Sequence, residues 1–108
     1  EAEHVFEYEY DKGYEWKVMA YADEKLLVTE EYTDYPPEEI YSEYYPVGLY
    51  KATVKGIKKG NGALILAHVK KGEGIETATQ VFLSRFYVDE DNMLTLVTEE
   101  DAMFLINK

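Results

Sequence analysis

The chain contains no cysteine, so it can form neither a disulfide framework nor a thiolate metal site. Only three residues are proline, and no apolar run approaches the roughly 20 residues needed to cross a bilayer. Basic residues are also scarce: 11 Lys and Arg stand against 22 Asp and Glu, a formal net charge of −11. Because this charge repels phosphates and anionic lipid headgroups, we expect neither a nucleic acid partner nor membrane insertion.

Residues that favour strands are abundant, with eleven tyrosines and 46% hydrophobic side chains. Such side chains fit a pleated, half-buried sheet surface. The hydrophobic content also argues against general disorder, and the length of 108 residues suits one domain over 1–108 without disulfides. We therefore predict a single all-β domain.

Apolar and polar residues alternate along most of the chain, which is the period-two pattern of half-buried strands. Trp16 lies on the apolar side of the second alternating segment, so we expect it to be buried between two sheets. The predicted strands are 4–10, 14–22, 26–29, 49–55, 63–69, 75–88 (with a bulge near Ser84 and Arg85) and 93–97. This spacing is typical of a β-sandwich of about seven or eight strands.

The last segment, 98–108, has two interpretations. Thr98 and Asp101 resemble a helix cap, which would begin a short C-terminal helix. Residues 102–106 form an apolar run that suits a short buried strand, and we favour this strand.

Residues 30–47 carry all three prolines, five tyrosines and many acids. The tandem Pro36-Pro37 excludes a central strand, and a short helical turn at 38–41 is compatible with it. A connection this long in a compact domain is usually functional or mobile. Two interpretations stay open: a solvated acidic crossover between the sheets, or a partner-contact loop whose tyrosines supply rigid contact area.

Catalytic and metal-binding patterns are sparse. His4 and His68 have no partner at a recognisable spacing, and a histidine in a strand usually makes ordinary hydrogen bonds. Ser42 and Ser84 lack the glycine-flanked turn of a hydrolase nucleophile. The acidic run 89–92 lacks the glycine and distant glutamate of a calcium loop, so a hairpin turn is the better interpretation. We predict no enzyme activity, no metal and no cofactor.

Loops at one end of a sandwich commonly bind partners. Here the relevant loops are 9–13, 46–48 and 69–74. The sequence therefore predicts a protein-binding module that contacts its partner through these three loops.

The run 9–16, which ends in Gly13-Tyr14-Glu15-Trp16, and the later Gly60 and Leu66 resemble in order the chagasin-like inhibitors of papain-type cysteine proteases, over residues 6–88. The family's first motif is Asn-Pro-Thr-Thr-Gly, then an aromatic residue and Trp. It aligns with the run Glu9-Tyr10-Asp11-Lys12-Gly13-Tyr14-Glu15-Trp16. Gly60 and Leu66 match later family anchors, and the family's Arg-Pro-Trp positions fall on Lys70-Lys71-Gly72.

The resemblance implies an immunoglobulin-like β-sandwich, a secreted or cell-surface location, and inhibition by loops that enter a protease cleft. The binding motifs are degenerate, since Asp11-Lys12 replaces the family's threonine pair and Gly72 its tryptophan. Residues 89–108 lie beyond the family's usual end, which implies an extra C-terminal hairpin or edge strand. The implied partner-binding residues are Tyr10, Asp11, Lys12, Gly13, Val47, Gly48, Lys70, Lys71 and Gly72.

We therefore expect a protein-binding module, with inhibition of papain-type proteases as the function that the resemblance implies. The alternative is a non-inhibitory extracellular structural or adhesion-type module. That module docks through the acidic, tyrosine-rich crossover at 30–47.

Overall fold

The computed structural model describes residues 3–10, 13–35 and 47–105. Within these ranges the two helical segments are the 3₁₀ turns η2 (Ile75–Thr77) and η3 (Met103–Leu105), and no helix there has the length and apolar character of a membrane span. The strands are β1 (Glu3–Tyr10), β2 (Tyr14–Tyr21), β3 (Leu26–Asp34), β4 (Gly48–Gly56), β5 (Gly60–Lys70), β6 (Gln80–Val88) and β7 (Leu94–Asp101).

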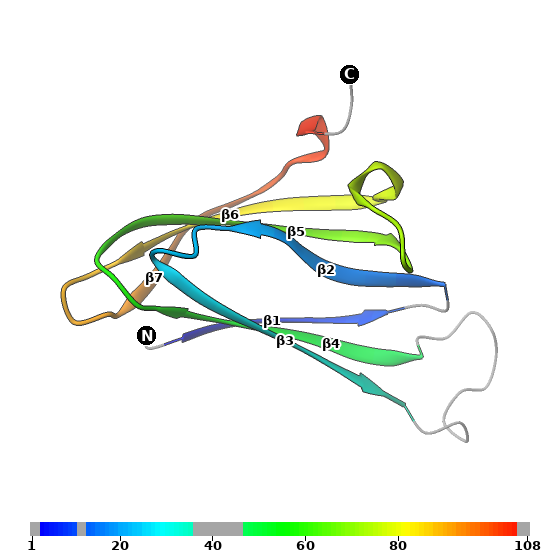
Figure 1. Ribbon diagram of the computed structural model, residues 1–108, viewed down its shortest axis with the longest axis horizontal. Coiled ribbons are helices and arrows are strands. Elements are labelled where there is room, and N and C mark those ends of the chain that lie inside the picture. Colours follow the sequence, from blue (N-terminus) through cyan, green and yellow to red (C-terminus); the bar gives the residue numbers. More distant parts are fainter. Residues whose placement is uncertain (1–2, 11–12, 36–46, 106–108) are drawn as a thin grey trace.

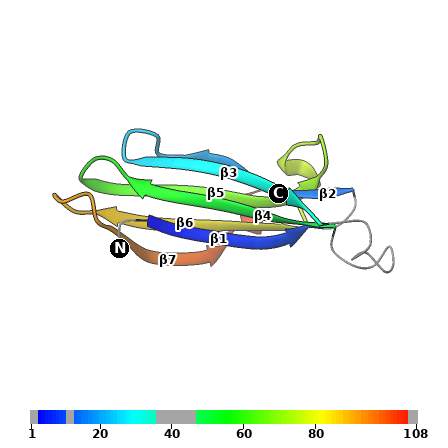
Figure 2. The same cartoon turned by 90° about the horizontal axis from the view of Figure 1, so that it is seen from below.

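The strands form two antiparallel sheets that pack as the predicted sandwich (Figure 1). One sheet has the order β1-β4-β3, which Figure 2 shows from below, and the other has the order β2-β5-β6-β7. The orders β1-β4-β3 and β2-β5-β6 are those of strands B-E-D and C-F-G in an immunoglobulin domain. Strand β7 forms a hairpin with β6 and ends the sheet, which confirms the predicted C-terminal edge strand.

Trp16 lies in the core between the sheets with 5% of its surface exposed, as the alternation predicted. Its indole stacks on Tyr8 of the opposite sheet, with 4.1 Å between ring centroids, and lies nearly parallel to Phe82 at 6.0 Å. Tyr50 and Leu66 are also fully enclosed in this core. Because burial of one large apolar side chain contributes about 2 kcal/mol, Trp16 and its neighbours are a main source of stability.

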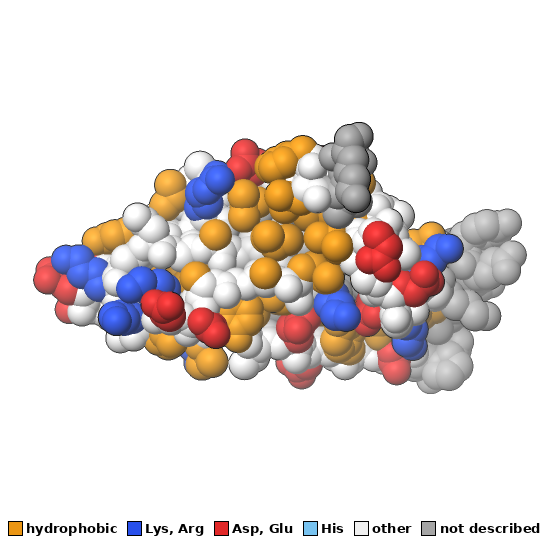
Figure 3. Space-filling model, turned by 45° about the horizontal axis from the view of Figure 1, so that its top comes forward, with side chains coloured by type: hydrophobic (Ala, Val, Ile, Leu, Met, Phe, Trp, Pro, Cys, Tyr) orange, Lys and Arg blue, Asp and Glu red, His pale blue; other side chains and the backbone are white. Residues whose placement is uncertain are grey.

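The four-stranded sheet also buries side chains on its outer face. Ala67, Val69 and Val81 form a second cluster there, and Ala102 packs onto them from the segment after β7. Figure 3 shows hydrophobic side chains gathered over this sheet. Strand β5 lies between β2 and β6 and is covered on both faces along part of its length, as its apolar run predicted.

The strand predicted over 75–88 is shorter than expected, because its first residues form η2. There the Thr77 hydroxyl donates to the Gly74 carbonyl oxygen at 2.8 Å, and the Lys70 amide donates to the Thr77 hydroxyl at 3.0 Å. These bonds hold a tight turn instead of an extended chain, so β6 begins only at Gln80.

A bulge lies beside Ser84 and Arg85, but it is in the partner strand β7 and not in the 75–88 segment where it was predicted. The pairing of β6 with β7 shifts after Arg85, which lies opposite Thr98, whereas Phe86 lies opposite Leu96. The extra residue therefore belongs to β7, not to β6.

The short strand favoured for 102–106 is wrong. Strand β7 continues to Asp101, so Thr98 lies inside a strand and caps no helix, and η3 follows at 103–105. The Asp101 carboxylate accepts the Met103 amide proton at 2.8 Å, which turns the chain. Ala102 supplies the buried contact that the apolar run suggested.

The crossover predicted over 30–47 begins later than expected, because β3 continues through Asp34. Polar side chains of β3 bond to the backbone of β2 in the opposite sheet. The Glu30 carboxylate accepts the Val18 amide proton at 3.0 Å, and the Tyr32 hydroxyl donates to the Trp16 carbonyl oxygen at 2.6 Å. These bonds cover backbone groups of an edge strand. Residues 36–46, including the turn predicted at 38–41, lie outside the described residues.

Candidate functional site

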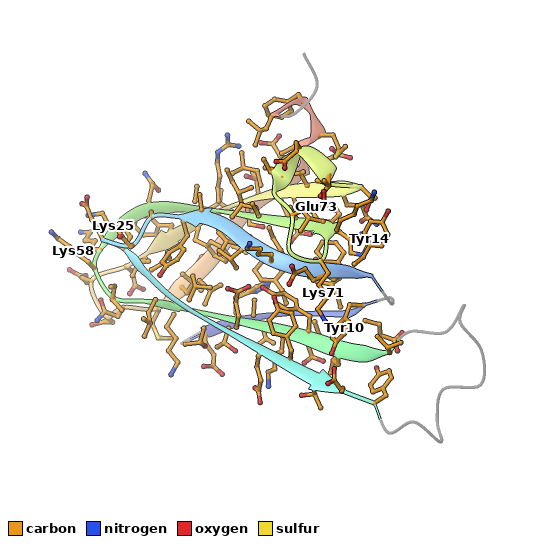
Figure 4. The ribbon with its side chains drawn as sticks, turned by 45° about the vertical axis from the view of Figure 1, so that its right-hand side comes forward. Tyr10, Tyr14, Lys25, Lys58, Lys71 and Glu73 are labelled. Atoms are coloured by element: carbon orange, nitrogen blue, oxygen red, sulfur yellow. The ribbon has the colours of Figure 1, made fainter. Side chains whose placement is uncertain are left out.

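Three connections meet at one end of the sandwich, on the right in Figure 1: the described ends of β1–β2 and of β3–β4, and the β5–β6 connection. They correspond to the B–C, D–E and F–G loops of an immunoglobulin domain. In Figure 4, Tyr10, Tyr14 and Lys71 lie at this loop end, and Lys25 and Lys58 lie at the opposite end. These are the three loops that the sequence predicts to lie together, 9–13, 46–48 and 69–74.

Backbone hydrogen bonds join the three connections. The Lys71 amide donates to the Gly13 carbonyl oxygen, and the Val47 amide donates to the Tyr10 carbonyl oxygen, each at 2.9 Å. The Gly72 amide donates to Glu15 Oε2 at 3.0 Å. The described parts of the loops are therefore held in one arrangement before any partner arrives, which lowers the entropy cost of binding.

An open groove of about 390 Å³ lies between these connections. Three tyrosines and Val47 supply its apolar surface, and two carboxylates and one ammonium supply its charges. The lining residues are Tyr10, Gly13, Tyr14, Glu15, Tyr32, Asp34, Val47 and Lys71. A concave, mostly apolar surface with a few polar groups is the usual form of a binding site.

The structure brings together four of the residues implied as partner-binding: Tyr10, Gly13, Val47 and Lys71 line the groove. Two more are exposed beside it, Lys70 at the end of β5 and Gly72 in the connection that follows. The pair Asp11-Lys12 lies outside the described residues.

Gly48, the remaining residue of that set, is buried at the start of β4. It lies between Tyr10 and Asp34 in the sheet, and the Tyr10 phenol crosses over it to bond with the Asp34 carboxylate. A β-carbon at Gly48 would lie 2.2 Å from the Tyr10 hydroxyl oxygen. Gly48 thus shapes the groove from beneath.

Sequence reasoning missed four groove residues: Tyr14, Glu15, Tyr32 and Asp34. Tyr32 and Asp34 fall within the predicted crossover, although with Glu30 they continue the period-two alternation of β3 and so share one face. That period-two spacing was the available signal.

Two groove phenols resist ionisation. Burial raises the pKa of Tyr10 to about 12, and the hydrogen bond to Asp34 and the charge of that carboxylate add to the effect. Burial also raises the pKa of Tyr32 to about 12, with further contributions from the negative charges of Glu30 and Glu15. Both residues therefore stay neutral at physiological pH, in a region of negative potential.

The other polar residues singled out in the sequence have local roles. The His68 ring bonds with the Thr79 hydroxyl and stacks on Tyr14 at 5.2 Å, the ordinary role expected of a strand histidine. The Asp89 carboxylate accepts the Asp91 and Met93 amide protons and so shapes the hairpin turn. Among the described residues, no group of three or more His, Asp or Glu is placed to hold a metal ion.

Comparison with known proteins finds no matching family model. No curated protein and no solved structure matches the chain either.

Proposed function

We propose that this protein is a binding module that docks a protein partner at the loop end of the sandwich. The observation that carries the proposal is the groove where three sequence-distant connections meet, tied to one another by backbone hydrogen bonds. Rigid aromatic walls favour the proposal, because tyrosines supply large contact areas at low entropy cost.

The class of partner that we propose is a papain-type cysteine protease. This step is supported by the resemblance to chagasin-like inhibitors, whose inhibitory loops align with the β1–β2, β3–β4 and β5–β6 connections. It is also supported by the strand orders, since B-E-D and C-F-G place those loops at one end.

An inhibition assay tests the partner class. Progress curves for hydrolysis of a peptide substrate by papain and by cathepsin L are recorded with increasing amounts of the protein. We expect inhibition at or below micromolar concentration. No inhibition at micromolar concentration would exclude the protease and leave the fold unaffected.

A matched pair of substitutions tests the docking surface. Tyr14→Ala removes an aromatic wall of the groove, and we expect the inhibition constant to rise by at least about tenfold. Tyr87→Ala is the control, because Tyr87 lies outside the groove lining on β6 and is 37% exposed. Equal effects of the two substitutions would contradict docking at the loop end.

A further inference from the structure

Two of the three tyrosine hydroxyls that line the groove, those of Tyr10 and Tyr32, offer a ligand acceptors and no donor. The Tyr10 hydroxyl donates its proton to Asp34, and the Tyr32 hydroxyl donates its proton to a backbone carbonyl oxygen. Because a phenol has one proton, both groups can offer a ligand only lone pairs. Asp34 accepts through Oδ1 and Glu15 through Oε2, so each carboxylate has a second oxygen with which to accept from a ligand.

Two backbone donors beside the groove are already used. The Lys71 amide bonds to Gly13 and the Val47 amide to Tyr10. The charged groups of the lining are two carboxylates and the ammonium of Lys71, whose side chain is exposed. Since the whole chain carries −11, a positively charged ligand is attracted and an anionic one repelled.

The aromatic walls suit the same kind of ligand. The rings of Tyr10 and Tyr32 meet edge to face, with 6.0 Å between centroids and 74° between planes. A cation is attracted to the negative face of an aromatic ring. The carboxylate charges that raise the pKa of Tyr32 also stabilise a cation placed beside it.

We infer that the groove binds a cationic side chain presented by the partner, an arginine in preference to a lysine. The planar guanidinium stacks on tyrosine rings, donates a bidentate pair of hydrogen bonds to a carboxylate, and loses its hydration more readily than an ammonium. The inference rests on the proposed function, because it names the side chain that the loop end recognises.

A peptide titration tests the inference on the groove itself. The probes are two capped tripeptides, Leu-Arg-Leu and Leu-citrulline-Leu, which differ in charge and hardly in shape. Binding is followed by backbone amide shifts in NMR spectra of the ¹⁵N-labelled protein. We expect the arginine peptide to bind at least about fivefold more tightly and to shift Gly13, Tyr14 and Gly72. Equal binding of the two peptides, or none, would overturn the inference.

Two substitutions should change the affinity for the arginine peptide in opposite directions. Asp34→Asn keeps an acceptor for Tyr10 and removes a charge, so affinity should fall by about fivefold. Lys71→Gln removes the opposing charge from an exposed side chain, so affinity should rise by about twofold. Asp23→Asn and Lys25→Gln at the opposite end are matched controls, expected to leave the affinity unchanged. Parallel changes in a groove variant and its control would contradict the inference.

The outcomes separate the two proposals. If Tyr14→Ala abolishes protease inhibition but the arginine and citrulline peptides bind equally, docking at the loop end stands and the cationic side chain is wrong. If the arginine preference holds but papain and cathepsin L are not inhibited, the groove has its proposed chemistry and the protease is the wrong partner.

Discussion

The phenol of Tyr50, fully buried in β4, donates a 2.8 Å hydrogen bond to the Glu30 carboxylate on neighbouring β3. The same oxygen, Oε2, accepts the Val18 amide proton of β2 in the opposite sheet. One carboxylate therefore satisfies a buried phenol and joins the two sheets along their β2–β3 side. Tyr50 has a strongly raised pKa, chiefly from burial and then from its bond to Glu30.

Glu30→Ala should lower the free energy of unfolding by about 2 kcal/mol, because the buried Tyr50 phenol loses its acceptor. Glu30→Gln retains an acceptor for the Tyr50 phenol and should lower the free energy of unfolding by less. The control is Glu31→Ala on the same strand, where the exposed side chain should contribute no more than about 0.5 kcal/mol. Urea denaturation measures all three, and a loss for Glu31→Ala as large as that for Glu30→Ala would contradict the role of this carboxylate.

Stability should fall in alkali between pH 10 and about pH 12. The pKa values of Tyr10 and Tyr32 are raised from 10.0 to about 12 in the folded protein. In the unfolded chain both ionise near pH 10, so the folded state holds more protons above that pH. Their contribution is complete below pH 10 and is lost as the pH rises through about 12.

Urea denaturation at a series of alkaline pH values measures this loss. In Tyr32→Phe one of the two groups is removed, so the fall in stability across that pH range should become smaller. The ultraviolet absorbance of tyrosinate should show a late-ionising class in the folded protein that disappears in urea. A folded protein whose tyrosines all ionise together near pH 10 would contradict the burial of these phenols.

The sequence predicted the sandwich and the position of Trp16 well, since both follow from local alternation and turn residues. It failed where polar residues have distant partners. Glu30, Tyr32 and Asp34 resembled a solvated loop because acids and tyrosines beside prolines are usually exposed. Their partners Val18, Trp16 and Tyr10 are 12 to 24 residues away, and only the packing of the sheets brings them within reach.

Only part of the groove could be predicted from the sequence. Loop placement suggested Tyr10, Gly13, Val47 and Lys71, because strand count and order imply which loops share an end. Asp34 lines the groove because β3 extends as far as this residue. That boundary was misplaced, and with it the acidic character of the groove.

Ser84→Ala should stabilise the protein by about 1 kcal/mol. The Ser84 side chain is 1% exposed on the inner face of β6, and among the described residues its hydroxyl has no hydrogen-bond partner. Burying an unpaired hydroxyl is costly, and a methyl group of similar size avoids that cost. Thermal and urea denaturation measure the change, and a clear loss of stability would show that the hydroxyl is satisfied in solution.

Gly48→Ala should both destabilise the fold and disable the groove. The new methyl group would meet the Tyr10 hydroxyl oxygen at 2.2 Å and the Thr33 carbonyl oxygen at 2.7 Å, so Tyr10 has to leave Asp34. We expect a loss of about 2 kcal/mol in unfolding free energy together with weaker binding of the arginine peptide.

Gly72→Ala is the matched comparison, because a methyl group there meets nothing within 4 Å and only the backbone φ of +79° opposes it. That strain should cost about 1 kcal/mol and leave the preference for arginine over citrulline intact. If Gly48→Ala kept the preference for the arginine peptide over the citrulline peptide, the position of Tyr10 above Gly48 would not be required for binding. The selectivity of the groove would then come from Glu15 and the other lining residues.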